Sequence, residues 1–368
     1  MRILSVGRAF PSHYYDQQSL LDAIRRHWSD RHVNPERLER LHKNALVTGR
    51  HMVRPIETYE AFETWGEAND VWIQEAPSLA EQALGEALDQ AGLAVDAVDL
   101  IMTTTVTGLA VPSLDALLMN RLPFRRHTKR VPLFGLGCAA GAAGLGRVAD
   151  YLRAFPDQVA VLLSVELCSL TVQKQDLSIP NLIATSLFGD AAAAVVMAGE
   201  DAARQSKDTG RWTAEVVDSR SVLYPDTERA LGWDISERGF QIVLSAEVPD
   251  LVGRHLRQDI DRFLADHGLE RHDIAHWICH PGGPKVLQAV EESLELPDGA
   301  LDLTWRSFKR VGNLSSASVL AILKDTLDDL ASRSEAGSEA RSAYSFLLAM
   351  GPGFSLDMVL LNFQRSES

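Results

Sequence analysis

The sequence predicts an α/β fold with a mostly buried sheet, and three observations support this prediction. Apolar segments such as Val159–Val165 alternate with segments of helical spacing, as expected for strands covered by helices. A similar order of strands and helices recurs in the second half, which suggests a duplicated α/β unit without a residue-level repeat. The polar run Glu200–Arg211 lies between the two. We therefore expect two halves, residues 1–205 and 206–368.

In the first half, apolar runs predict strands, and amphipathic spacing predicts the helices between them. The expected strands are Met1–Val6, Val98–Val106, a short one from Val131, Val159–Val165 and Ala191–Met197. The expected helices are Gln17–Trp28, Glu36–Asn44, Pro77–Ala91, one from about Ser113 and one that ends near Phe155.

The same patterns continue in the second half. The expected strands are Glu215–Val222, Phe240–Ser245, Ile274–Cys279, Ser342–Met350 and Ser355–Phe363. The expected helices are Asp250–His267, Pro284–Leu294 and Ser316–Leu330, and Ala331–Arg341 is expected to be a surface loop.

Composition narrows the class of protein. A net charge of −14 argues against general binding to nucleic acid or anionic membranes. No apolar run is long enough for a signal peptide or a membrane span, so a cytoplasmic protein is expected. The three cysteines, Cys138, Cys168 and Cys279, are odd in number and widely spaced. They predict neither a disulfide framework nor a metal site, and Cys168 and Cys279 are expected to be core residues.

The stretch Val131–Arg147 presents Cys138 where a strand turns into a helix. The N–H groups of a helix start favour a thiolate, and a strand–turn–helix elbow is a known way to expose a nucleophile. A small buried hydrophobe is the alternative interpretation of such a cysteine. The glycines and alanines around Cys138 are expected to leave space for an acyl chain.

Two further residues lie at junctions between strands and helices. His280 follows the predicted strand that ends at Cys279, at an edge where open α/β sheets bind ligands. Asn313 precedes the helix that starts near Ser316, where ordinary capping is the default explanation. Together with Cys138 they suit thioester chemistry. The thiolate would attack an acyl thioester with His280 as its ion-pair partner, and His280 and Asn313 would donate hydrogen bonds to an enolate oxygen.

The motifs GCAAG at Cys138, HPGGPKVL at His280 and GNLSSASVL at Asn313 resemble those of the type III polyketide synthases. These are the chalcone-synthase-like members of the thiolase superfamily. The resemblance extends over essentially the whole chain, including LFGD at Leu187–Asp190 and MGPGFS at Met350–Ser355. It implies a thiolase-like αβαβα layered fold, a homodimer, CoA thioesters as substrates and no further cofactor.

Position by position, the resemblance implies further site residues. Phe188 and Phe240 match two aromatic gatekeepers between a CoA tunnel and the reaction cavity, although core packing is their alternative interpretation. The expected cavity and cyclisation residues are Thr107, Thr171, Ser315, Gly351, Pro352 and Gly353. Arg40, Lys43 and Arg50 lie where the family binds CoA phosphates, or else form a solvated face.

The activity implied is acyl transfer. A starter from acyl-CoA is loaded on Cys138, malonyl-CoA is condensed with loss of CO₂ in repeated rounds, and an α-pyrone or resorcinol-type product leaves. We predict a medium or long fatty acyl starter, because Val111 and other positions carry small or aliphatic residues. The alternatives are a tetrahydroxynaphthalene-type synthase that uses only malonyl-CoA, a β-ketoacyl-carrier-protein synthase III, and a non-catalytic binding subunit of the same fold.

Overall fold

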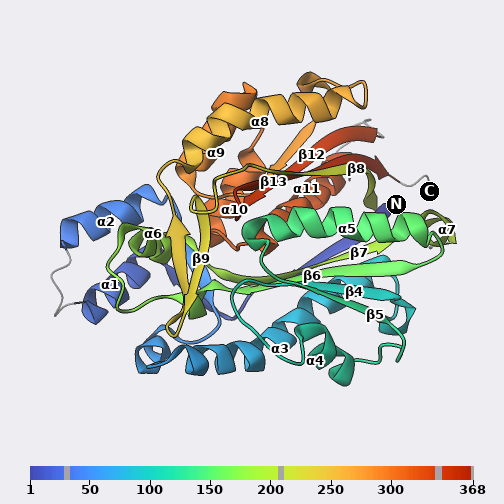
Figure 1. The fold of residues 1–368 in the computed structure, drawn as a ribbon. Helices are drawn as coiled ribbons and strands as arrows, with labels where there is room; N and C mark the ends of the chain where they lie inside the picture. Colours follow the sequence, from blue (N-terminus) through green and yellow to red (C-terminus); the bar gives the residue numbers. More distant parts are fainter. Residues whose placement is uncertain (29–33, 206–210, 336–341, 366–368) are drawn as a thin grey trace.

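The structure is a computed structural model that describes residues 1–28, 34–205, 211–335 and 342–365 (Figure 1). Nine strands form one mixed sheet in the order β11-β12-β13-β8-β1-β7-β6-β4-β5, and the pairs β2–β3 and β9–β10 form two small ribbons. The strands are β1 Arg2–Ala9, β2 His13–Asp16, β3 Gly49–Met52, β4 Leu100–Thr104, β5 Lys129–Leu133, β6 Val159–Leu167, β7 Asp190–Ala198, β8 Trp212–Leu223, β9 Leu231–Ser236, β10 Gly239–Leu244, β11 His276–Cys279, β12 Ser342–Gly351 and β13 Ser355–Arg365.

The helices pack on the outer faces of this sheet and between its two sets of strands. They are α1 Gln17–His27, α2 Pro35–Asn44, α3 Trp65–Ala91, α4 Leu114–Arg121, α5 Ala140–Ala154, α6 Ile179–Leu187, α7 Glu200–Gln205, α8 Val248–Ala265, α9 Pro284–Leu294, α10 Asp302–Val311 and α11 Ala317–Glu335. Short 3₁₀ turns include η1 Ile56–Ala61, η3 Gly137–Ala139 and η4 Cys168–Thr171.

The hydrophobic core has three large parts, and these define five layers. The apolar faces of α3 and α4 pack on strands β4, β6 and β7, and helices α8 to α10 pack on β11, β12 and β13. Between the two sets of strands, α5 and α11 share a third cluster (Figure 1). Helices and strands therefore alternate in five layers, and both strand layers belong to the one nine-stranded sheet. This order confirms the αβαβα layering expected from the sequence.

The two central helices are in contact through backbone at the start of α5. A Cβ added at Gly141 would lie 2.3 Å from the carbonyl oxygen of Ser316, so only glycine fits there. This close approach brings the residues before α5, including Cys138, next to the residues before α11, including Asn313.

Several boundaries differ from the sequence-based expectation. Helix α3 begins at Trp65 rather than Pro77, because Thr64 and Glu67 form a capping box and Pro77 lies inside the helix. Strand β9, which pairs with β10, was not expected. Residues up to Glu335 of the expected loop belong to α11, and residues 336–341 lie outside the described part of the chain. The polar run at 200–211 begins with α7, and its residues 206–210 also lie outside the description.

Candidate active site

Cys138 lies in the turn between β5 and α5, as the sequence predicts. Gly135 and Gly137 on either side of Leu136 have φ values of +97° and +53°, which glycine adopts without strain. Cys138 is partly exposed, whereas Gly137 and Ala139 on either side of it are buried. Cys138 therefore lies at the start of a helix and is accessible from solvent.

Ser315 connects Cys138 to Asn313. The Cys138 Sγ donates to the Ser315 Oγ at 3.6 Å, and the Ser315 N–H donates to the Asn313 Oδ1 at 2.8 Å. Ser315 has a φ of +51°, an uncommon conformation for a residue with a Cβ, of the kind that concentrates at functional sites. The bond from the Ser315 N–H engages the side-chain oxygen Oδ1 of Asn313. It therefore determines which end of the Asn313 amide carries the NH₂ donor.

The backbone around Asn313 joins the two halves of the chain. Its N–H donates to the Leu187 carbonyl at 2.8 Å, and the Gly189 N–H donates to the Asn313 carbonyl at 2.9 Å. These two bonds form an isolated parallel bridge between Phe188 and Asn313. The expected gatekeeper and the expected oxyanion donor are therefore fixed to each other.

His280 follows β11 and is 2% exposed. Its backbone N–H donates to the Leu348 carbonyl of the neighbouring strand β12 at 2.9 Å. The Nδ1 atom of its imidazole has no hydrogen-bond partner in the described chain. Strand β12 then leads to Gly351. A Cβ there would lie 2.6 Å from the Leu136 carbonyl, so the loop Gly351–Gly353 packs on the turn that holds Cys138.

Burial is the largest influence on the pKa values of Cys138 and His280, the expected reactive groups. Although Cys138 keeps some exposed surface, desolvation of its thiol raises its pKa to about 12, against a smaller lowering by the bond to Ser315, and the charge of Glu166 raises this pKa further. Burial alone lowers the pKa of His280 to about 3. Both groups therefore favour their neutral forms as folded. The thiolate–imidazolium pair expected from the sequence stays a prediction.

Glu166 is a functional candidate that the sequence reading missed. It is fully buried in β6, accepts from the Thr107 Oγ1 at 3.0 Å and from the Val106 N–H at 3.1 Å, and is hydrogen-bonded by Ser316. Burial raises its pKa despite these bonds. A single acidic residue within an otherwise apolar strand was the available signal, since a charge is seldom buried without a reason.

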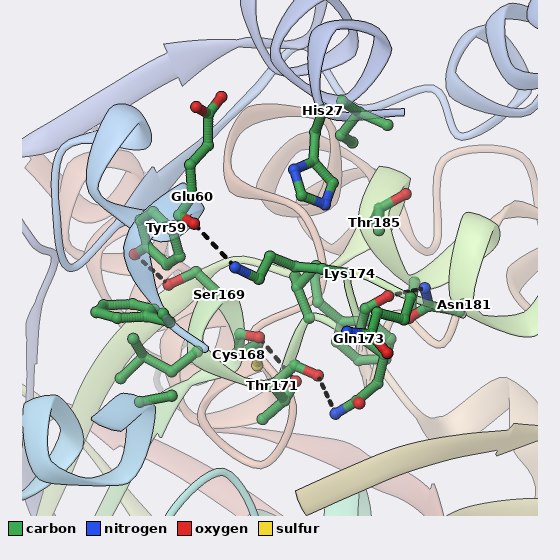
Figure 2. A pocket seen from close by; sticks show the side chains of 18 of the residues that line it. His27, Tyr59, Glu60, Cys168, Ser169, Thr171, Gln173, Lys174, Asn181 and Thr185 are labelled. Carbon is green, nitrogen blue, oxygen red and sulfur yellow. Dashed lines mark hydrogen bonds between the residues drawn. The ribbon is translucent and has the colours of Figure 1, made fainter. Parts of the chain in front are cut away.

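A cavity of about 440 Å³ lies beside this network. Its walls come from α1, β3, η1, the start of α3, η4, α6 and the β9–β10 ribbon, and they include Arg50 and Phe188. Figure 2 shows Thr171 on this wall. Cys168 is buried, as expected from the sequence, and it also lines the cavity. Burial raises the pKa of the Cys168 thiol, and the charges of Glu166 and Asp190 raise it further.

The remaining expected residues lie in three settings. Phe240 is 1% exposed and its ring contacts those of Trp65 and Trp233, which line the cavity. Arg40 and Lys43 are exposed on α2. Arg50, in contrast, is 4% exposed and donates from Nη1 to the Phe188 carbonyl at 3.0 Å.

The small residues after Cys138 serve helix packing. Gly141 abuts the Ser316 carbonyl, and a Cβ at Gly144 would lie 2.6 Å from the Leu162 Cδ1. Both are buried in the central layer. The expectation that these residues leave space, rather than serve generic helix packing, is therefore wrong for these two glycines.

Two negative observations apply to the described residues. They include no group of three or more His, Cys, Asp or Glu side chains that could hold a metal ion. None of their helices combines the length and the apolar character needed to cross a membrane.

Comparison with known proteins covers the whole chain. The family model for the N-terminal domain of chalcone and stilbene synthases matches residues 1–201, and the model for their C-terminal domain matches residues 215–364. A 1,3,6,8-tetrahydroxynaphthalene synthase of Streptomyces peucetius subsp. caesius is 50% identical over 98% of this chain and 93% of its own length. A 3,5-dihydroxyphenylacetyl-CoA synthase of Streptomyces toyocaensis is 30% identical over 98% of this chain and 90% of its own.

A solved structure agrees with these matches. The 1,3,6,8-tetrahydroxynaphthalene synthase of Streptomyces coelicolor, described as a bacterial type III polyketide synthase, superposes with a TM-score of 0.90 at 30% identity. The superposition covers 100% of both chains.

Proposed function

The chain belongs to the chalcone and stilbene synthase family of type III polyketide synthases, and on that premise we propose that it makes a tetrahydroxynaphthalene-type product from malonyl-CoA alone. The observation that carries this proposal is the 50% identity, over 98% of the chain, to a synthase named for that product. A naphthalene skeleton consists wholly of two-carbon units, so malonyl-CoA can supply both its starter and its extenders.

The proposed loading step begins with the thiol of Cys138. Its sulfur bonds to the carbonyl carbon of a CoA thioester, the proton passes to the neutral imidazole of His280, and CoA leaves as the C–S bond to it breaks. Because burial favours the neutral forms of both groups, proton transfer accompanies the attack. CoA takes up the proton as it departs.

In the proposed extension step, malonyl-CoA loses CO₂ and its electron pair becomes an enolate. The Nε2–H of the His280 imidazole and the side-chain NH₂ of Asn313 donate hydrogen bonds to the enolate oxygen, where the negative charge develops. The bond between Ser315 and the Asn313 Oδ1 fixes which end of the amide is a donor. The enolate carbon then attacks the acyl carbon on Cys138, and the C–S bond to Cys138 breaks, which leaves a β-ketoacyl-CoA. The Cys138 sulfur then attacks the thioester carbonyl of this product, and CoA leaves as the longer chain returns to Cys138.

A fatty acyl starter is the second candidate function. The cavity of about 440 Å³ favours it, because Leu20 and Ile24 of α1 and Trp28 directly after α1 give one wall an apolar surface. The identity to the tetrahydroxynaphthalene synthase favours the malonyl-only reaction, which we place first.

Incubation of the purified enzyme with ¹³C-malonyl-CoA tests the two candidates. The malonyl-only reaction yields a fully labelled aromatic product whose mass matches tetrahydroxynaphthalene or its oxidised quinone. A requirement for added octanoyl- or palmitoyl-CoA, with one unlabelled acyl chain in each product, would support the fatty acyl reaction and refute the first candidate. A carrier-protein arm with malonyl-carrier protein in place of malonyl-CoA tests the synthase III alternative.

We also propose that the enzyme is a homodimer, as the family implies. Val111, on the loop after β4, is an apolar residue that is fully exposed in the single chain. Light scattering of the purified protein tests the proposal, and a monomer at micromolar concentration would refute it.

A further inference from the structure

Arg50 is a buried cation that lines the cavity and is engaged by the backbone of the protein itself. It lies in β3, and its Nη1 donates to the Phe188 carbonyl at 3.0 Å. Its Nε is buried and has no hydrogen-bond partner in the described chain. Arg40 on α2 is exposed to solvent, where a phosphate could reach it. The Arg50 guanidinium is thus oriented by the protein itself.

The aliphatic part of Arg50 packs on the two strands of the Phe188–Asn313 bridge. A Cβ at Gly189 would lie 3.3 Å from the Arg50 Cβ, and a Cβ at Gly312 would lie 3.1 Å from the Arg50 Cδ. Gly189 follows Phe188, and Gly312 precedes Asn313. One side chain therefore touches both segments that the bridge joins.

Asp190 supplies the opposite charge. It is fully buried, and its negative charge opposes the lowering of the Arg50 pKa by burial. Its two carboxylate oxygens accept from the N–H groups of Ser169 in η4 and Val53 after β3, each at 2.7 Å. Asp190 consequently links the segment after β3 to η4, in the wall of the cavity that carries Thr171, and its negative charge stabilises the Arg50 cation.

We propose that Arg50 is a positioning residue that holds the bridge between Phe188 and Asn313, and so keeps the Asn313 amide aligned for malonyl decarboxylation. The inference rests on the proposed decarboxylative function, but it is independent of which starter is used. Arg50 touches no reacting atom in this role. It acts through the Phe188 carbonyl and the backbone of Gly189 and Gly312.

The experiment compares malonyl-CoA with malonyl-N-acetylcysteamine, a thioester without the CoA phosphates, as substrates for decarboxylation. Arg50→Met keeps the apolar stem and removes the donors. We expect the turnover rate to fall roughly 10- to 100-fold with both thioesters, since a lost charged hydrogen bond and a displaced amide have effects of that size. The KM should change by less than about twofold, and alkylation of Cys138 by iodoacetamide should stay within about threefold of the wild-type rate.

Arg40→Met is the matched control for a phosphate role. It should raise the KM for malonyl-CoA and leave the reaction of malonyl-N-acetylcysteamine unchanged. If Arg50→Met behaves like Arg40→Met, or leaves both rates unchanged, the positioning role is overturned.

Arg50→Lys is a second variant for the case in which Arg50→Met does not fold, because lysine keeps a positive charge near Asp190. It should show the same pattern with a smaller loss and a native circular dichroism spectrum. An equal loss of decarboxylation and Cys138 alkylation in Arg50→Lys would point to general disruption and overturn the proposal. A wild-type enzyme inactive on both thioesters would overturn the proposed function as well, whereas an active wild type with an unaffected Arg50→Met overturns only the role of Arg50.

Discussion

Replacement of Gly137 by alanine tests the contact between the Cys138 turn and the Gly351–Gly353 loop. At φ +53° an added Cβ costs about 1 to 2 kcal/mol. It would also lie 2.4 Å from the Pro352 Cδ, and overpacking of this kind costs about 1 to 3 kcal/mol. We therefore expect Gly137→Ala to lower the free energy of unfolding by about 2 to 5 kcal/mol in total.

Gly92→Ala is the matched control, because Gly92 has a φ of +67° and no atom within 4 Å of the added Cβ. It should lose only the conformational share, about 1 to 2 kcal/mol. Urea unfolding of both variants measures the difference. In the double variant Gly137→Ala with Pro352→Ala, about 1 to 3 kcal/mol should be regained, because the two sites are in contact.

The functional consequence of Gly137→Ala is a displaced thiol, so malonyl decarboxylation should change less than acyl loading. Intact-protein mass spectrometry follows loading of Cys138, which should slow about tenfold or more. Equal stability losses in Gly137→Ala and Gly92→Ala, with no recovery in the double variant, would refute the contact.

Three other predictions concern the proposed site. Cys138→Ala should abolish acyl loading, while His280→Ala and Asn313→Ala should retain loading in part and lower malonyl decarboxylation by about 10²- to 10³-fold; an undiminished polyketide yield from any of them would remove that residue from its role. Because burial raises the pKa of Cys138 to about 12, the rate of its alkylation by iodoacetamide should rise steadily between pH 6 and 9; a rate independent of pH would instead indicate a standing ion pair with His280. Burial lowers the pKa of His280 to about 3, below its value of 6.5 in the unfolded chain, so the stability that it contributes is present above pH 6.5 and is lost as the pH falls toward 3. The difference in unfolding free energy between wild type and His280→Gln should therefore shift against the wild type by up to about 1.4 kcal/mol per pH unit in that range, and a constant difference would contradict the assignment.

Sequence patterns predicted those parts of the site that depend on local structure. Cys138 and Asn313 stand before the helices that their flanking residues favour, and His280 stands after its strand. Sequence spacing places the start of α3 at Pro77, because proline is a favoured first residue of a helix, whereas the Thr64–Glu67 capping box begins the helix at Trp65.

Long-range packing set what the patterns could not predict. Arg50 occurs in a basic region of the sequence together with Arg40 and Lys43, and no local pattern distinguishes a buried cation from its exposed neighbours. Its burial depends on Gly189 and Gly312, which are 139 and 262 residues away in the numbering of the chain. The size of the cavity likewise depends on segments as distant as α1 and the β9–β10 ribbon.

The site exists only where the two halves meet, and this accounts for the kind of residue found there. Cys138 belongs to the first half, and Asn313 belongs to the second. They are held together by three backbone approaches: Gly141 on Ser316, Gly351 on Leu136, and the bridge between Phe188 and Asn313. The first two approaches are too close for a side chain, so glycine at positions 141 and 351 fixes distance rather than merely permitting a turn. A substitution at Gly141 or Gly351 should therefore separate nucleophile from oxyanion donor while both halves keep their own cores, and activity should be lost before secondary structure.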